Sequence, residues 1–334
     1  MVAVDYAALL KEAEPELKGP RPKAWLDRLE ADYDRVLATL DRAEPTDGLW
    51  MANVLHRFWL DRGHVDEGRR RLDALLSDPA NANPSSTRAR ALHSAGMLAF
   101  RQGDNDTSRG LTAESLEVAR AVSDRSAEAS ALAQLARVAL RDHDLAAARR
   151  RGEESAAIWR ELGDEFGLSG AVHVIAYASY VEGDDERARA LFEESLELRR
   201  RLGDRDMVAG ELTNLCSVET RAGNLDRAQE LGEESLRIAR EVGSSYLLPY
   251  CVANLGGLAV ARGDAERGAR LMGAAEAMFD AAGLAIDPGT AIELERHLER
   301  ARRDLGDAFD ATWSEGRAMP AERAIEYALG TTFR

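Results

Sequence analysis

The chain has 334 residues and a formal net charge of −15 at pH 7; 45% of its residues are hydrophobic and 6% are aromatic. Such an acidic chain lacks the basic face of a general nucleic-acid-binding protein, so we expect no direct binding to nucleic acid. Small residues dominate the apolar set, which suits close packing between helices.

The first 45 residues are predicted to form N-terminal capping helices, one short and one longer. Gly19, Pro20 and Pro22 interrupt the pattern, and the longer helix is expected over Trp25–Ala43. Residues 1–10 contain neither a basic region nor a small-residue cleavage site, so we do not expect a signal peptide there.

Residues 46–283 are periodic, with a repeat length of 40 residues. The first ladder of repeated positions consists of Gly63, Gly103, His143, Gly183, Gly223 and Gly263. The second ladder, 20 residues out of phase, consists of Gly163, Gly203, Gly243 and Gly283. We call each of these positions a rung. Asp or Asn follows most rungs of the first ladder. Because glycine ends helices and Asp or Asn starts them, the pattern predicts six stacked helical hairpins.

Two columns of residues support this register. Eight residues before each rung of the first ladder stand Leu55, Ala95, Leu135, Ile175, Leu215 and Leu255. Five residues before each rung stand Phe58, Leu98, Val138, Ala178, Val218 and Leu258. Their separation of three residues places both columns on one helix face, which we expect to be buried.

Three Glu-Glu-Ser segments recur in the second helices, ending at Ser155, Ser195 and Ser235. We interpret the serines as small packing residues and not as parts of a metal or carboxylate site. The glutamates are expected on the outer face, paired with arginines such as Arg199 and Arg237.

Residues 284–334 are predicted to form a C-terminal helical cap, because a repeat array needs a polar cover on its last apolar face. One helix is expected from about Thr290 to Leu305, and two shorter ones around Asp307–Gly316 and Pro320–Leu329.

The hairpin unit resembles the tetratricopeptide repeat. Leu is followed by a small residue, then by Gly-Asp, and then by Ala five residues on, at Ala148, Ala188 and Ala228. The resemblance covers roughly Thr46 to Gly283. We therefore expect an all-α fold: a right-handed tetratricopeptide-repeat superhelix, or α-solenoid, of about six 40-residue hairpins with helical caps.

The flanking segments extend this resemblance. The segments "AEPELKGPRPKAWLDRLEADYDRVLATL" and "GARLMGAAEAMFDAAGL" are similar to the two ends of the sensor region of large ATP-dependent bacterial transcriptional regulators of the LuxR/MalT-like, STAND type. The resemblance implies a sensing or autoinhibitory role and an NTPase module of the same native polypeptide as a partner. It implies no catalytic residue, because the nucleotide motifs of that family lie outside the matched region.

The sequence offers no catalytic or metal site. It contains no phosphate-loop motif, no HExxH and no GxSxG, so we expect no enzyme activity, cofactor or metal. Cys216 and Cys251 lack metal-ligand spacing and indicate a reduced, cytoplasmic protein. The longest apolar candidate, 171–181, is too short to span a membrane.

A concave groove lined by first helices is the predicted binding site. By analogy with tetratricopeptide arrays, its lining positions lie thirteen, ten, six, three and two residues before each rung. The candidate ligand-binding residues are Arg57, Arg90, His93, Arg101, Arg137, Arg141, His173, Tyr177, Tyr180 and Arg221. Guanidinium groups suit carboxylates and phosphates, whereas the alternative is that these arginines pair with helix ends or with neighbouring glutamates.

Three functions are compatible with this pattern. The leading one is a non-enzymatic sensor or interaction module of a signalling or transcription regulator, which binds a peptide, a protein segment or a small anionic effector in the groove. The second is a free-standing protein- or peptide-binding scaffold unrelated to transcription. The third, an enzyme that uses the groove as a pocket, has no matching set of residues.

Overall fold

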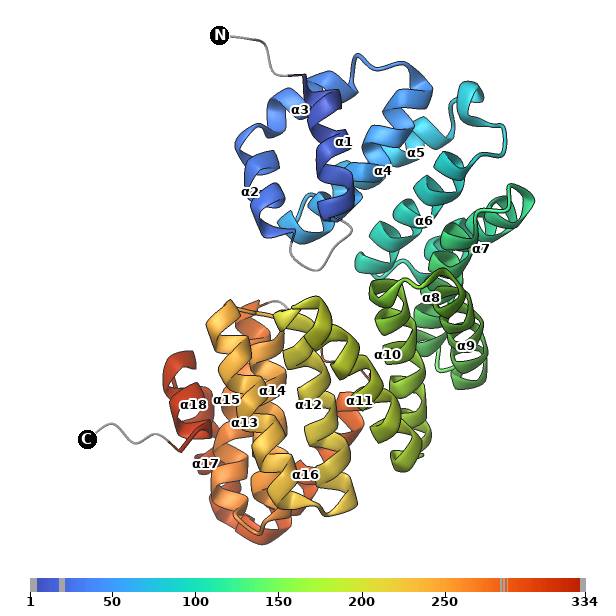
Figure 1. Ribbon diagram of the computed structural model, residues 1–334. Coiled ribbons are helices and arrows are strands. Elements are labelled where there is room, and N and C mark those ends of the chain that lie inside the picture. The colour runs from blue at the N-terminus through green and yellow to red at the C-terminus, as the bar shows by residue number, and fades with distance from the viewer. Residues whose placement is uncertain (1–4, 18–21, 283, 285, 287, 331–334) are drawn as a thin grey trace. The chain divides into compact units, whose positions relative to one another are not determined.

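The computed structural model describes residues 5–17, 22–282, 284, 286 and 288–330. Its regular elements are all helices, with no strand in those ranges, which confirms the expected all-α fold (Figure 1). The chain divides into two compact units, Met1–Ala178 and Ser179–Arg334. The expected breaks at Gly19 and Pro20, and the expected repeat end at Gly283, lie outside the described residues.

Three helices precede the repeats. They are α1 (Tyr6–Leu17), α2 (Lys23–Ala31) and α3 (Tyr33–Leu40). The single helix expected over Trp25–Ala43 is wrong, because the chain breaks at Asp32, which has φ −115° and ψ 18°. The Asp32 carbonyl accepts the N–H groups of Arg35 and Val36, which begin α3. The break lets Leu29 of α2 and Val36 of α3 enter one core.

Helical hairpins follow, each with a first and a second helix. In the first unit the pairs are α4 (Pro45–Arg62) with α5 (Val65–Leu76), α6 (Ser86–Arg101) with α7 (Asn105–Ala121), and α8 (Arg125–Arg141) with α9 (Leu145–Leu162). The boundary between the units falls in α10 (Glu165–Glu182), and α11 (Asp185–Leu202) follows it. The second unit continues with α12 (Arg205–Ala222) and α13 (Leu225–Val242), then α14 (Leu247–Ala261) and α15 (Ala265–Ala282). A short 3-10 helix, η1 (Pro79–Asn81), lies between α5 and α6.

Residues with a left-handed backbone separate the helices at the ladder positions. The glycines of the first ladder have φ values from 79° to 89°, and His143 has φ 60°. Ser123, which was not recognised from the sequence, holds a rung of the second ladder with φ 57°. The Asp residues that follow the rungs cap the next helix: Asp104, for example, accepts the N–H of Thr107 at 3.2 Å. The turn chemistry therefore repeats even where glycine is replaced.

The predicted columns form the core of the hairpins. All twelve residues of the two apolar columns are buried, and none is more than 4% exposed. The three serines are also fully buried. Ser155 donates to the carbonyl of Ala129 at 2.8 Å, and Ser235 donates to that of Ala209 at 2.7 Å. Their interpretation as packing residues is confirmed.

Arg199 departs from its expected place on the outer face. It is only 7% exposed, and its Nη1 lies 3.1 Å from Oδ2 of Asp204. Arg199 stands one turn before the helix-ending Gly203, so its side chain reaches the residue that caps α12. Arg237, in contrast, is exposed and pairs with Glu233 one turn earlier, as expected.

The C-terminal residues form helices close to the expected ranges. They are α16 (Pro288–Leu305), the 3-10 helix η2 (Gly306–Ala308), α17 (Phe309–Arg317) and α18 (Ala321–Ala328). α17 crosses α15 with the backbones in contact, because a Cβ added at Gly316 would stand 2.1 Å from the carbonyl oxygen of Arg270.

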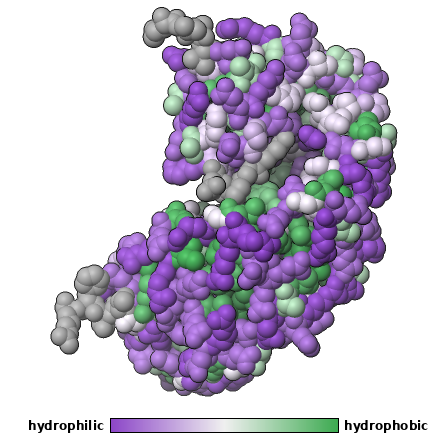
Figure 2. All heavy atoms as spheres, viewed as in Figure 1, coloured by the Kyte–Doolittle hydropathy of each residue, from purple (hydrophilic) through white to green (hydrophobic). Residues whose placement is uncertain are grey.

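Hydrophilic residues cover most of the face seen in Figure 2, and hydrophobic residues show between them over the second unit. Among the described residues, the exposed large hydrophobic side chains are Leu162, Val242, Tyr246 and Ile292.

Candidate ligand-binding face

The first helices of successive hairpins lie close together on one side of each unit. α4 packs on α6 and α6 on α8 in the first unit, and α12 packs on α14 in the second. We call the surface of these helices the inner face. α10 contributes to the inner face of both units: residues up to Ala178 belong to the first unit, and the last turn from Ser179 belongs to the second. All ten candidate residues lie on these helices.

At α4, internal contacts engage the candidate positions. Arg57 pairs with Asp61 one turn later, with Nε 2.7 Å from Oδ2. Trp50, another predicted lining residue, donates its indole N–H to Glu14 of α1 at 3.0 Å. The buried Asn53 accepts a hydrogen bond from Ser94 at 2.8 Å. The N-terminal helix and these local contacts therefore cover this end of the inner face.

Two candidate arginines hold helix ends. Arg90 of α6 pairs with Asp124, the N-cap residue of α8, at 3.0 Å. Arg141 of α8 donates to the carbonyl of Phe100 at 2.7 Å and to Asn105 at 3.0 Å. Its guanidinium carbon also lies 3.4 Å from the centre of the Phe100 ring. The contacts that the sequence left as an alternative for these arginines are thus present at both residues.

A group of basic side chains lies farther along the inner face. Burial lowers the pKa of His93 to about 3, with His56 and Arg137 as further causes. His93 is therefore neutral at physiological pH, and its Nδ1 is buried without a hydrogen-bond partner among the described residues. The Arg137 guanidinium extends to α10, where Nη2 would lie 3.3 Å from a Cβ at Gly170. His56 was missed as a site residue, although it stands seven residues before Gly63, where later repeats carry small residues such as Gly96 and Ala136.

Arg101 and the two α10 candidates complete the first-unit set. Arg101, the last residue of α6, is exposed and makes no hydrogen bond or ion pair within the described part of the chain. His173 and Tyr177 are partly buried on α10. Gly170, His173 and Tyr177 stand at helical spacings of three and four residues, so they share one face of α10, the face that Arg137 approaches.

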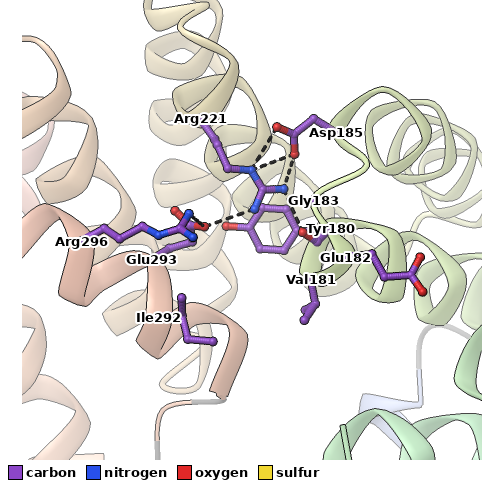
Figure 3. A pocket seen from close by; sticks show the side chains of 9 residues that line it. All are labelled: Tyr180, Val181, Glu182, Gly183, Asp185, Arg221, Ile292, Glu293 and Arg296. Atoms are coloured by element: carbon purple, nitrogen blue, oxygen red, sulfur yellow. Dashed lines mark hydrogen bonds and ion pairs between the residues drawn. The ribbon is translucent and has the colours of Figure 1, made fainter. Parts of the chain in front are cut away.

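The second unit holds the remaining two candidates, Tyr180 and Arg221, in direct contact. The guanidinium carbon of Arg221 lies 4.1 Å from the centre of the Tyr180 ring. Burial raises the pKa of the Tyr180 hydroxyl above its usual value. Arg221 also forms ion pairs with Asp185 and with Glu293 of α16 (Figure 3). Neither carboxylate was predicted, because each belongs to an element distant in sequence.

The described part of the chain holds neither a candidate metal site nor a helix suited to a membrane. Within the described ranges, no group of three or more His, Cys, Asp or Glu side chains could hold a metal ion. None of the described helices is long and apolar enough to cross a membrane. Burial raises the pKa of the free Cys216 thiol to about 12, and it also raises that of Cys251.

Comparison with known proteins supports the fold. Residues 87–161, which extend from α6 to α9, match the family model of the tetratricopeptide repeat. No curated protein sequence matches the chain. A Rap protein complexed with Competence and Sporulation Factor has a TM-score of 0.61 and 15% identity, over 98% of this chain and 96% of that chain.

Two further solved structures are similar. NprR in complex with its cognate peptide NprX has a TM-score of 0.54 and 16% identity, over 96% of this chain and 91% of that chain. A STAND protein with a tetratricopeptide repeat sensor, from Pyrococcus horikoshii, has a TM-score of 0.56 and 14% identity, over 93% of this chain and 45% of that chain. At these identities the likeness establishes a tetratricopeptide-like fold alone.

Proposed function

We propose that the chain is a non-enzymatic sensor or interaction module of a signalling or transcription regulator. Its ligand, a peptide, a protein segment or a small anionic effector, binds to the inner face of the first unit. The observation that carries the proposal is that α6 and α8 contribute two arginines, Arg101 and Arg137, and the neutral His93 to this face.

The charge of these side chains favours an anionic group on the ligand. Arg101 is exposed and unpaired among the described residues, and Arg137 extends toward α10 beside the neutral His93. Guanidinium groups bind carboxylates and phosphates through parallel hydrogen bonds. His173 and Tyr177 add aromatic surface and polar atoms, which suit contacts with a peptide backbone or a ring.

A peptide is the ligand class that the structural neighbours favour. The Rap protein is complexed with Competence and Sporulation Factor, and NprR is complexed with the peptide NprX. Both neighbours align with more than nine-tenths of this chain. We therefore place an acidic peptide first among the three ligand classes.

The protein context has two candidate forms. The flanking sequences and the likeness to the STAND sensor, of which the chain covers 45%, support an NTPase module in the same native polypeptide, transcription as its output and a cytoplasmic location. The second form is a free-standing peptide- or protein-binding scaffold, which the near-complete coverage of the Rap and NprR chains favours. Sequencing the native transcript distinguishes them by the presence or absence of an upstream NTPase.

The ligand can be sought with a defined library of short peptides, half of them acidic. Protein and library are mixed, free peptides are removed by gel filtration, and retained peptides are identified by mass spectrometry. We expect the parent to retain acidic peptides and an Arg101→Glu, Arg137→Glu variant to lose them. Arg70→Glu, at an exposed residue of the second helix α5 that pairs with Glu67, is the matched control and should behave like the parent. Retention without preference for acidic peptides, or equal retention by the double variant, would refute the proposed site.

A further inference from the structure

The C-terminal helix α16 lies on the inner face of the second unit. It packs on α14 and α15, and its His297 ring lies directly on the backbone of α14. A Cβ added at Gly257 would stand 2.7 Å from Cδ2 of that ring. Glu293, one turn before His297, reaches α12 and pairs with Arg221. Gly257 and Arg221 occupy two of the lining positions, six and two residues before a rung, so α16 covers the surface that a ligand of this unit would use.

The guanidinium of Arg221 forms a direct ion pair with the carboxylate of Glu293, which is the contact that an arginine would make with a carboxylate ligand. Its Nη1 donates to Oε1 of Glu293 at 3.1 Å, and its Nε donates to Asp185 at 2.8 Å. Its Nη2 donates to the carbonyl of Tyr180 at 2.8 Å (Figure 3). The side chains of Arg221 and Glu293 are only 20% and 16% exposed. Because Asp185 and Tyr180 fix the plane of the guanidinium, its remaining donor edge stays directed at the position of the Glu293 carboxylate.

The two ends of α16 are held unequally. Ala301 is fully buried, and Leu294, Leu298 and Leu305 pack against the same core cluster. At the other end, Ile292 is 51% exposed. A cavity of about 230 Å³ lies beside it, lined by Ile292, Arg296 and residues at the end of α10. The turn of α16 before Leu294, which carries Ile292 and Glu293, can therefore separate from the inner face while the rest of the helix stays in the core.

We propose that the turn of α16 that carries Glu293 is a tethered occupant of a second binding site, whose external ligand is an acidic helical segment of a protein partner. The site consists of Arg221, fixed by Asp185 and Tyr180, together with the adjoining cavity lined by Val181 and Gly183 at the end of α10. The ligand places a Glu or Asp where Glu293 now lies. Because α16 competes from within the chain, the site is closed until the partner displaces it.

This proposal concerns the second unit, and its test uses none of the first-unit residues, so either proposal can fail without the other. The probe is a labelled synthetic peptide with the sequence of residues 288–305, added to the full chain. Glu293→Gln in the protein weakens the tethered competitor, and the peptide should then bind about tenfold more tightly than to the parent. Glu299→Gln, at an exposed residue of the same helix, is the matched control and should leave the affinity at the parent value.

The role of Arg221 is tested from both sides of the contact. A peptide that carries Glu293→Gln should bind the Glu293→Gln protein about tenfold more weakly than the natural peptide does. This comparison does not change the folding of the protein. Adding Arg221→Gln to the Glu293→Gln protein should weaken binding of the natural peptide to a similar degree. Hydrogen exchange should be faster in residues 288–293 than in 294–305. Equal affinities of the parent and the Glu293→Gln protein, or of the two peptides, would overturn the proposal.

Discussion

The imidazole of His93 shows how one side chain on the inner face is shaped by its surroundings. Burial removes water from the ring, and electrostatic interactions with His56 and Arg137 also disfavour its protonated form, so all three effects lower the pKa of His93, to about 3. The ring is neutral when the protein is folded at physiological pH. Its Nδ1 is buried and has no hydrogen-bond partner among the described residues.

This shift predicts a dependence of stability on pH. Because the folded pKa lies below the unfolded value of 6.5, the unfolded state binds more protons between these values. The stabilisation is present above pH 6.5 and is lost as the pH falls toward 3. Between about pH 7.5 and about pH 5, the parent should lose about 2 kcal/mol more unfolding free energy than a His93→Gln variant.

Urea unfolding at the two pH values provides the measurement. His143→Asn, at an exposed turn residue with positive φ, serves as the control and should follow the parent. A His93→Gln variant that loses as much stability as the parent would show that His93 titrates normally in the folded protein.

For single residues, the sequence predicted which helix carries each candidate side chain better than it predicted the residues that the side chain contacts. Counting back from the glycine rungs placed all ten candidate side chains on first helices. It could not identify contacts that join elements distant in the chain: Arg221 and Asp185 are 36 residues apart, and Arg221 and Glu293 are 72 apart. Arg199 was misplaced for a different reason, because it was assigned to the glutamates of its own helix and pairs instead with Asp204 across the turn at Gly203.

Most helix ends can be predicted from glycine and Asp. The prediction fails where another residue ends or begins a helix. Glycine followed by Asp predicts most turns because glycine adopts positive φ at low cost and Asp caps the following helix. Ser123 adopts the same conformation without being glycine, and Asp32 divides a helix that the apolar pattern left continuous. The packing of Leu29 and Val36 into one core accounts for the break at Asp32, whereas Ser123 lies 40 residues before Gly163 and takes the turn position of the repeat.

The crossing of α15 and α17 gives a prediction about helix packing. A Cβ at Gly316 would stand 2.1 Å from the backbone oxygen of Arg270, so Gly316→Ala must push the helices apart. We expect a loss of about 1–3 kcal/mol in unfolding free energy. Gly110→Ala makes the same chemical change on α7 with no atom within 4 Å, and should instead stabilise by about 0.5–1 kcal/mol. Chemical denaturation of both variants tests this, and a Gly316→Ala protein as stable as the parent would contradict the close crossing.

For the whole molecule, the 40-residue period predicted the hairpins and their order. It carried no information on the tail, which has no repeat of its own. A cap was expected from residue 284 onward, yet the period could not reveal that α16 runs over the lining positions Gly257 and Arg221. Nor could it reveal that α1 contacts Trp50 at the other end. Non-repetitive helices contact the inner face in each unit, and α6 and α8 bear the basic group proposed as the ligand site.

The most direct test of this site is isothermal titration of an acidic peptide, selected from the library, into the parent, Arg137→Glu and Arg70→Glu proteins. Charge-assisted hydrogen bonds contribute about 1.5–3 kcal/mol each, so Arg137→Glu should bind at least about tenfold more weakly than the parent. Arg70→Glu should bind like the parent, and added salt should weaken binding to both. Equal affinities for the parent and Arg137→Glu would contradict ligand binding at the inner face of the first unit.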